Sequence, residues 1–231
     1  MKDIKNILNK ITIPSHINKL KFDIGLSYNA PVSRKMLEQD ANLFIYGVEP
    51  NIESINSVNT YVSEYLNSNR MCILPFALDN VEEPTEREFF HTSNDPGCSS
   101  LHKPIVNNIT VGSVNTVTTY PLFTLFENIN WTRFNYIEWV KIDAQGSDLD
   151  ILKSAKNYLQ DRVDYVTAEP GGHQYENCEN CTANNINEYM LSQNFLPVYD
   201  RVSDPTFINK KFIHLRDQIF LHLNETAWQT D

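Results

Sequence analysis

Acidic side chains follow four apolar segments that have the character of buried strands. Like charges that gather at one edge of a sheet repel one another unless a ligand or a cation offsets them. Because these segments bring no lysine to a phosphate-binding position, the pattern favours a cationic nucleoside over a phosphate-bearing ligand. The four acidic segments are Asp23-Ile24-Gly25, Glu49-Pro50-Asn51, Asp143-Ala144-Gln145-Gly146 and Glu169-Pro170-Gly171-Gly172.

The elements that would position these acids alternate between strands and helices. Such alternation predicts an α/β protein with a three-layer, Rossmann-like, mainly parallel sheet of about seven strands whose last strand is antiparallel. In sheets of this kind, ligands bind beyond the carboxyl ends of the strands, where the strand order reverses. The predicted strands span 19–25, 43–51, 71–80, 136–146, 163–172, 195–202 and 217–223, and the predicted helices span 33–40, 52–68, 122–129, 147–161 and 183–194, with Ser147 as an N-cap.

Two segments stand outside this alternation. Residues 1–11 place Ile4, Ile7, Leu8 and Ile11 on one helical face, so 1–18 is predicted as an N-terminal helical segment. Residues 82–120 contain short strand-like runs and many turn residues, which indicate a β-hairpin insertion or flap. We expect one domain over 1–231, in which this insertion and the loop around 171–185 select the substrate.

The residues that follow the first three strands suit the parts of S-adenosylmethionine. Glu49 can accept hydrogen bonds from both ribose hydroxyls, and Gly25 allows the backbone to approach the amino-acid tail. Ala77 and Leu78 can lie against the adenine, with Asp79 near its amino group, and Asp143 would lie near the sulfonium. The first turn lacks the three-glycine pattern that binds a pyrophosphate, which disfavours NAD or FAD.

Several motifs together resemble the FkbM-type family of S-adenosylmethionine-dependent methyltransferases, over about residues 19–170. In chain order they read FDIG, YGVEPN, FALDN, GCSSL, TVTTYPLFTLF and WVKIDAQGSDLDILKSA. The resemblance implies the class I methyltransferase fold. It also implies a cofactor site formed by Asp23, Gly25, Ser27, Asn29, Glu49, Pro50, Asn51, Ala77, Leu78 and Asp143.

This sequence departs from the family pattern at three positions. Ser27 and Asn29 replace an Asn and a Gly of the usual first turn, although Asn tolerates a left-handed backbone. Gln145 replaces a Glu that usually follows the Lys-Ile-Asp segment, which removes one negative charge near the methyl-transfer zone. Ser99 and Ser100 of the GCSSL motif either line the site or stabilise a turn.

For the chemistry, Asp143 together with His173 or Glu169 would orient or deprotonate an acceptor hydroxyl. A histidine of near-neutral pKa is a suitable general base. Two alternative roles for Glu169 are to bind a metal together with Asp143 and to cap the Gly171-Gly172 turn. A metal-free site is favoured, and O-methylation of a sugar or small metabolite is expected by analogy with the family.

The formal net charge of −10 argues against broad contact with nucleic acid, so methylation of an RNA cap ribose is a weaker alternative. A binding protein without catalytic activity is another, because of Gln145 and Ser27.

We see no signal-like leader and no apolar run near 20 residues, and therefore expect a cytoplasmic protein without membrane contact. The single pair Cys178 and Cys181 does not complete a zinc site, and the oligomeric state stays open.

Overall fold

The computed structural model describes residues 4–199 and 204–215. Its main sheet has seven strands in the order β3-β2-β1-β7-β8-β10-β9. Strand β10 runs antiparallel to both of its neighbours, and β3, β2, β1, β7 and β8 are parallel to one another. This arrangement confirms the predicted sheet. The strands are β1 (Lys19–Ile24), β2 (Leu43–Val48), β3 (Met71–Leu74), β7 (Ile137–Ile142), β8 (Val163–Ala168), β9 (Phe195–Tyr199) and β10 (Thr206–Asn209).

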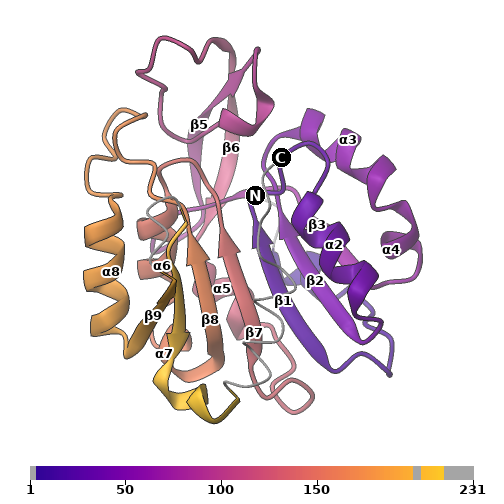
Figure 1. The fold of residues 1–231 in the computed structure, drawn as a ribbon. Coiled ribbons are helices and arrows are strands. Elements are labelled where there is room, and N and C mark those ends of the chain that lie inside the picture. Colours follow the sequence, from indigo (N-terminus) through magenta and orange to yellow (C-terminus); the bar gives the residue numbers. More distant parts are fainter. Residues whose placement is uncertain (1–3, 200–203, 216–231) are drawn as a thin grey trace.

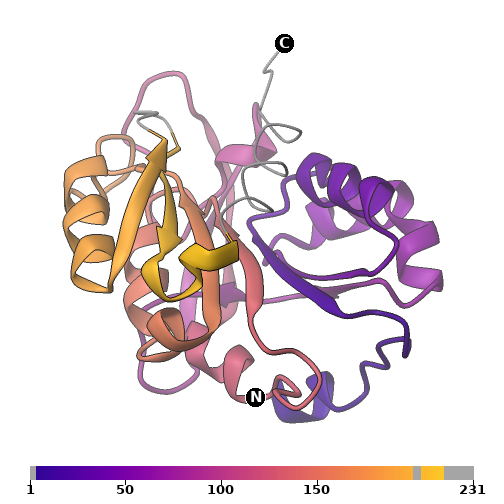
Figure 2. The ribbon, with the colours of Figure 1, turned by 60° about the horizontal axis from the view of Figure 1, so that its bottom comes forward.

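Helices cover both faces of the sheet, which gives three layers (Figure 1, Figure 2). Apolar side chains of α1, α5, α6, α7 and α8 join one core cluster, and those of α2, α3 and α4 join a second cluster. Strands β2 and β8 are buried along their whole length, as expected for strands covered on both sides. The helices are α1 (Ile4–Leu8), α2 (Pro31–Gln39), α3 (Ile52–Tyr61), α4 (Ser63–Asn67), α5 (Leu122–Glu127), α6 (Asp148–Ser154), α7 (Tyr158–Arg162) and α8 (Ala183–Ser192), with short 3₁₀ turns at Pro96–Cys98 and Lys210–Leu215.

The predicted insertion forms a second, three-stranded sheet in the order β4-β6-β5. Its strands are β4 (Ala77–Leu78), β5 (Thr85–Thr92) and β6 (Val111–Tyr120), and β5 pairs with β6 in an antiparallel hairpin. In Figure 1 this hairpin rises beyond the carboxyl edge of the main sheet. The strand order of the main sheet reverses between β1 and β7, so a ligand site is expected at this edge, beneath the hairpin.

Five local predictions need correction, and the first is that the predicted helix 52–68 divides at Val62 into α3 and α4. The predicted strand 71–80 divides between the two sheets, and β4 pairs with β6. The predicted helix 147–161 divides into α6 and α7, because the backbone turns left-handed at Lys156 (φ 53°). Ser147 precedes α6 but its side chain makes no capping hydrogen bond. The seventh strand is β10, and the predicted strand 217–223 lies outside the described residues. Among the residues that the structure describes, no helix combines the length and apolar character needed to cross a bilayer.

Candidate active site

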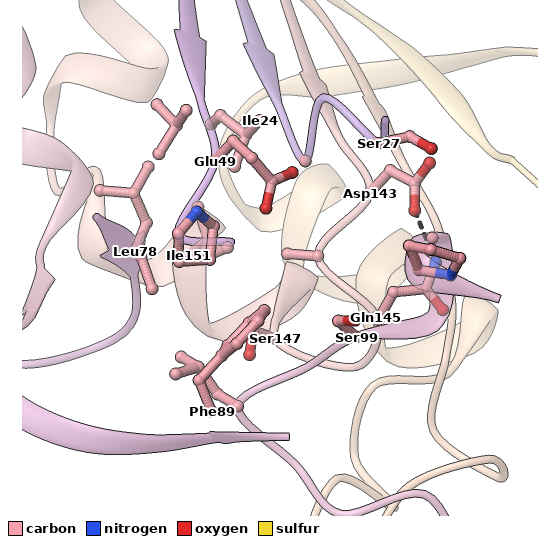
Figure 3. Close-up of a pocket in the computed structure, with 18 residues that line it drawn as sticks. Ile24, Ser27, Glu49, Leu78, Phe89, Ser99, Asp143, Gln145, Ser147 and Ile151 are labelled. Atoms are coloured by element: carbon pink, nitrogen blue, oxygen red, sulfur yellow. Dashed lines mark hydrogen bonds between the residues drawn. The ribbon is translucent and has the colours of Figure 1, made fainter. Parts of the chain in front are cut away.

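A pocket opens at the carboxyl edge of the main sheet, between the ends of β1, β2 and β7 and the hairpin insertion (Figure 3). Among the residues that the structure describes, no lysine, arginine or histidine lines it. Its lining residues are Ile24, Gly25, Ser27, Val48, Glu49, Pro50, Ala77, Leu78, Phe89, Pro96, Gly97, Ser99, Leu101, Asp143, Ala144, Gln145, Ser147 and Ile151. We refer to it as the first pocket.

One end of the first pocket is apolar. Leu78 from β4, Phe89 from β5 and Ile151 from α6 line it together, and Leu101 adds a further apolar side chain from the insertion. Figure 3 shows Leu78, Ile151 and Phe89 on one side of the pocket and the polar groups of Ser27 and Asp143 on the other. A ligand with an apolar planar end and a polar end therefore suits this pocket.

Gly25 allows the ends of β1 and β7 to approach each other closely. Its φ is +80°, and a Cβ atom at this position would lie 1.9 Å from the main-chain oxygen of Asp143. The Asp143 N–H donates to the Ile24 oxygen at 3.0 Å, and this hydrogen bond holds the two strand ends together. The left-handed positions that follow in this turn are Ser27 (φ 57°) and Ala30 (φ 44°), and Asn29 is not among them. The expectation that Asn29 adopts a left-handed backbone in place of the Gly of the family pattern is therefore wrong.

Glu49 is the buried carboxylate of the first pocket. It is 6% exposed, and its Oε1 accepts the Asn51 N–H at 2.8 Å. Figure 3 shows the carboxylate directed into the pocket. Burial raises the pKa of Glu49 to about 7. Pro50 lines the pocket beside it, whereas the Asn51 side chain caps α3 by accepting the N–H groups of Glu53 and Ser54.

Asp23 does not reach the first pocket. Strand register pairs Ile24 with Val48, so Gly25 and Glu49 follow at one level and Asp23 lies two residues lower. At that level Asp23 is the register partner of Lys141 on β7. Its carboxylate lies 3.3 Å from the Lys141 ammonium and accepts the Ser33 hydroxyl at 2.6 Å. Asp23 therefore contacts the site only through Lys141.

Lys141 supplies a buried positive charge beneath Asp143. Its Nζ lies 3.2 Å from the Asp143 carboxylate and donates to the Gly25 oxygen at 3.0 Å. Burial alone would lower the pKa of Lys141, but the charges of Asp143 and Asp23 outweigh it and raise the pKa. Lys141 thus keeps its proton and holds two carboxylates and the glycine turn together.

A second pocket adjoins the first pocket and shares Gly25, Ser27 and Asp143 with it. Glu169, at the end of β8, lines only the second pocket. Its lining combines carboxyl and hydroxyl groups with apolar side chains. The other lining residues are Leu26, Pro31, Val32, Lys141, Ile142, Thr167 and Asp204.

Gln145 joins the two carboxylates that border these pockets. Its Nε2 donates to Asp143 at 2.7 Å and to Glu169 at 2.9 Å. Burial and the Asp143 carboxylate raise the pKa of Glu169 to about 9. Burial would also raise the pKa of Asp143, but the Lys141 charge and hydrogen bonds lower it overall. The proton of this pair therefore favours Glu169, and the negative charge favours Asp143.

Asp148 is a site residue that sequence reasoning missed. Its side chain is fully buried at the start of α6 and accepts the Ala144 N–H at 3.2 Å and the Glu169 N–H at 3.0 Å. It thereby ties the segments that carry Asp143 and Glu169. Burial raises the pKa of Asp148 to about 7. The sequence signal for Asp148 is its place in the first turn of a predicted helix, where an acidic side chain is favoured by the helix dipole.

The remaining predicted residues differ in their position relative to the two pockets. His173 is exposed and lines neither pocket, and the Asp79 carboxylate instead pairs with Arg87 at 2.5 Å. Of the two serines in the GCSSL motif, Ser99 lines the first pocket and Ser100 donates to the Gln145 oxygen at 2.7 Å. The pocket residues Phe89, Pro96, Gly97, Leu101 and Ile151 were not predicted, because the packing of the insertion and of α6 against the strand ends cannot be read from local sequence patterns.

The cysteines add no metal centre in the part of the chain that the structure describes. All four are free thiols, and both Cys178 and Cys181 are buried beside the Gly172 backbone. Within residues 4–199 and 204–215, no group of three or more His, Cys, Asp or Glu side chains is arranged to hold a metal ion.

The sequence matches the family described as "Methyltransferase FkbM domain" over residues 23–197, which is more than half of the chain. No curated protein is significantly similar to it. Among solved structures, the chain is similar to a methyltransferase FkbM from Methylobacillus flagellatus KT, with 13% identity and a TM-score of 0.51 over 86% of this chain and 45% of that chain. The chain thus spans less than half the length of that relative, and the likeness concerns the fold alone.

Two further solved structures show weaker similarity. TrmK from M. capricolum, in complex with S-adenosyl-homocysteine, has 14% identity and a TM-score of 0.43 over 90% of this chain and 67% of that chain. PaMTH1 from Podospora anserina, also bound to S-adenosyl-homocysteine (SAH), has 9% identity and a TM-score of 0.45 over 83% and 72%.

Proposed function

Because this chain belongs to the FkbM methyltransferase domain family, we propose that it transfers a methyl group from S-adenosylmethionine to a hydroxyl of a sugar or another small metabolite. The observation that carries the proposal is the first pocket, which combines an apolar end, a buried carboxylate and a glycine turn, with no Lys, Arg or His among its described lining residues. These features match a cationic nucleoside that has no phosphate.

The cofactor fits the pocket part by part. The apolar end beside Leu78, Phe89 and Ile151 suits the adenine, and the Glu49 carboxylate suits the two ribose hydroxyls. The Gly25 turn, which a Cβ would fill, suits the amino-acid tail. When bound there, S-adenosylmethionine supplies an electrophilic methyl group on a sulfonium. NAD fits less well, because the lining offers no cation for a pyrophosphate.

The residues between the pockets would handle the acceptor. The ionised Asp143 carboxylate, which borders both pockets, orients the acceptor hydroxyl and takes up its proton at an Oδ atom. The protonated Glu169 donates a hydrogen bond within the second pocket, and orientation of the acceptor accounts for much of the rate. We assign no step to His173, since it is exposed and lines neither pocket.

Two alternatives are less well supported. An RNA substrate needs basic groups along its path, but within residues 4–199 and 204–215 the only basic lining residue of the two pockets is Lys141, which is paired with Asp23 and Asp143. A binding protein without turnover would keep the first pocket intact and lack methyl transfer. These two outcomes are separated by measuring binding and turnover independently.

The test of the cofactor is a thermal-shift and calorimetric comparison of S-adenosylmethionine, SAH and NAD. At a ligand concentration of about 100 times Kd, SAH should stabilise the protein by about 2.7 kcal/mol, which corresponds to roughly 5–10 °C in Tm. NAD should have no effect. Stabilisation by NAD alone contradicts the proposed cofactor.

The test of turnover measures SAH release with S-adenosylmethionine and a panel of polyol, amine and carboxylate acceptors. We expect release above background with neutral polyols only. Release with amines alone argues against O-methylation, and binding of SAH without release for any acceptor supports the inactive alternative.

A further inference from the structure

Gln145 uses every polar atom of its side chain inside the site. The two N–H bonds of Nε2 match two acceptors, the Asp143 carboxylate at 2.7 Å and the Glu169 carboxylate at 2.9 Å. Its Oε1 accepts the Tyr175 hydroxyl at 2.6 Å. The residue is therefore a fully bonded bridge between the ends of β7 and β8, and not a surface replacement of an acid.

The backbone fixes the direction in which Gln145 points. Its φ is 53°, a left-handed conformation that is costly for a residue other than Gly. The Ser100 hydroxyl of the insertion donates to the Gln145 oxygen at 2.7 Å, and Gly146 follows with φ +104°. The surrounding structure thus maintains a strained turn that directs the amide at the two carboxylates.

Asp143 determines which way the amide faces, and Tyr175 completes its hydrogen bonding. If the amide were reversed, its oxygen would face the ionised Asp143 carboxylate, and the two negative groups would repel each other. In the observed orientation the amide oxygen instead accepts the Tyr175 hydroxyl. Tyr175 is 1% exposed, and its hydroxyl also lies 3.1 Å from the Cys98 oxygen.

The charged groups around Glu169 come from several elements. Asp143 follows β7, Asp148 begins α6 and Asp204 precedes β10, and all three carboxylates disfavour a charge on Glu169. Lys141 on β7 is the cation of the cluster, and it lies against Asp143. The cluster is therefore asymmetric, with the positive charge on the Asp143 side.

We propose that Gln145 is a positioning residue that holds Asp143 and Glu169 as a singly charged pair at the border of the two pockets, with Tyr175 donating a hydrogen bond to its amide oxygen. The place of this pair beside the acceptor rests on the proposed function. The pair itself does not, because it exists in the protein without a ligand. A Glu at position 145 would add a third carboxylate and would lack the two N–H donors.

The test is nuclear magnetic resonance of the ligand-free protein with ¹³C-labelled carboxyl groups and ¹⁵N-labelled side-chain amides. The variants are Tyr175→Phe, Gln145→Met and Gln145→Glu, and Gln174→Met is the matched control, because Gln174 is an exposed neighbour in the loop that carries Tyr175. Signals of Glu169 and Gln145 are assigned from Glu169→Gln and Gln145→Met.

In the wild-type protein we expect Glu169 to be protonated and Asp143 ionised at pH 7.5, with slow hydrogen exchange of the Gln145 side-chain amide. Tyr175→Phe should speed this exchange about tenfold, as expected for the loss of one hydrogen bond. Gln145→Met should move the titration of Asp143 to higher pH, because Asp143 loses a donor. Gln145→Glu should make the cluster bind one more proton at pH 7.5. Gln174→Met should change none of these.

Rapid exchange of the wild-type Gln145 amide, at the rate of exposed Gln174, would overturn the proposal. Unchanged titrations of Asp143 and Glu169 in a folded Gln145→Met protein would do the same. If the Gln145→Met protein does not fold, the rate of Gln145 side-chain amide exchange in the Tyr175→Phe protein tests the proposal instead. Failure of SAH to bind, in contrast, contradicts the proposed function and leaves these measurements valid.

Discussion

At the scale of single residues, Glu49 keeps a carboxylate in a buried position where a ligand hydroxyl can reach it. Burial raises the pKa of Glu49 from 4.5 to about 7. In the unfolded chain the group ionises near its ordinary pKa, so the folded protein loses stability as the pH rises from 4.5 to about 7. Above that range the loss is constant. A group that costs stability while it faces a pocket is typical of a binding residue.

We predict that Glu49→Gln has opposite effects on binding and stability. The amide oxygen can still accept the Asn51 N–H, but it offers the ribose a weaker acceptor, so SAH affinity should fall about 10- to 100-fold. The free energy of unfolding at pH 8 should rise by up to about 3 kcal/mol, because no buried charge forms. At pH 4.5 the two proteins should be equally stable. Calorimetry and urea unfolding at both pH values measure these effects.

The matched control is Glu188→Gln, which changes an exposed acid on α8. It should leave SAH affinity unchanged and alter stability little at either pH. A Glu49→Gln protein that binds SAH as well as wild type, or that is less stable at pH 8, would contradict the assigned role.

At the scale of elements, the hairpin insertion forms part of the first pocket. Its face toward the main sheet carries Phe89, which packs with Ala77, Leu101 and Val117 in a small cluster of its own. The next residue, Phe90, lies on the opposite side and lines a separate polar groove. The two adjacent phenylalanines therefore report separately on the pocket and on the outer face of the same strand.

We predict that Phe89→Ala weakens SAH binding about tenfold, because the ligand loses an aromatic contact at the apolar end of the pocket. Phe90→Ala should change the affinity less than about twofold. Both affinities are measured by calorimetry on folded protein, with circular dichroism as a check of the hairpin. Equal losses in the two variants would show that hairpin stability, rather than contact with the ligand, explains the effect.

The elements also show where local sequence reasoning was limited. Strands β1, β2, β7 and β8 were predicted from apolar runs, since a strand covered on both faces needs such a run. Asp23 and Glu49 both look like acids at strand ends, yet the register places Asp23 opposite Lys141 and only Glu49 at the level of the pocket. A displacement of two residues along the strand thus separates a structural ion pair from a binding group.

At the scale of the whole molecule, charge is the dominant property. The chain carries a formal net charge of −10 and a pI of about 5.0. An acidic protein repels a phosphate backbone unless a local basic groove compensates, and the described lining residues of the two pockets form no such groove. The whole-molecule field therefore favours uncharged or cationic ligands.

We predict that the protein does not bind short RNA oligonucleotides with a Kd below about 10⁻⁴ M, even at 50 mM salt, where phosphate contacts are strongest. Fluorescence anisotropy of a labelled RNA measures this. SAH binding in the same sample serves as the control for folded protein and should change little between 50 and 200 mM salt. RNA binding that weakens steeply with salt would revive a nucleic-acid substrate.

The sequence by itself determined the sheet, the position of the insertion and the meeting of Gly25, Glu49 and Asp143. These follow from local patterns, because apolar runs specify strands and the carboxyl ends of parallel strands share one edge. Only the tertiary structure decided that Lys141 forms an ion pair with Asp23 and that Phe89 lines the pocket. It also decided that Gln145 bridges Asp143 and Glu169 and accepts a hydrogen bond from Tyr175. Such contacts join segments far apart in the chain, so they depend on register and packing that no local pattern contains.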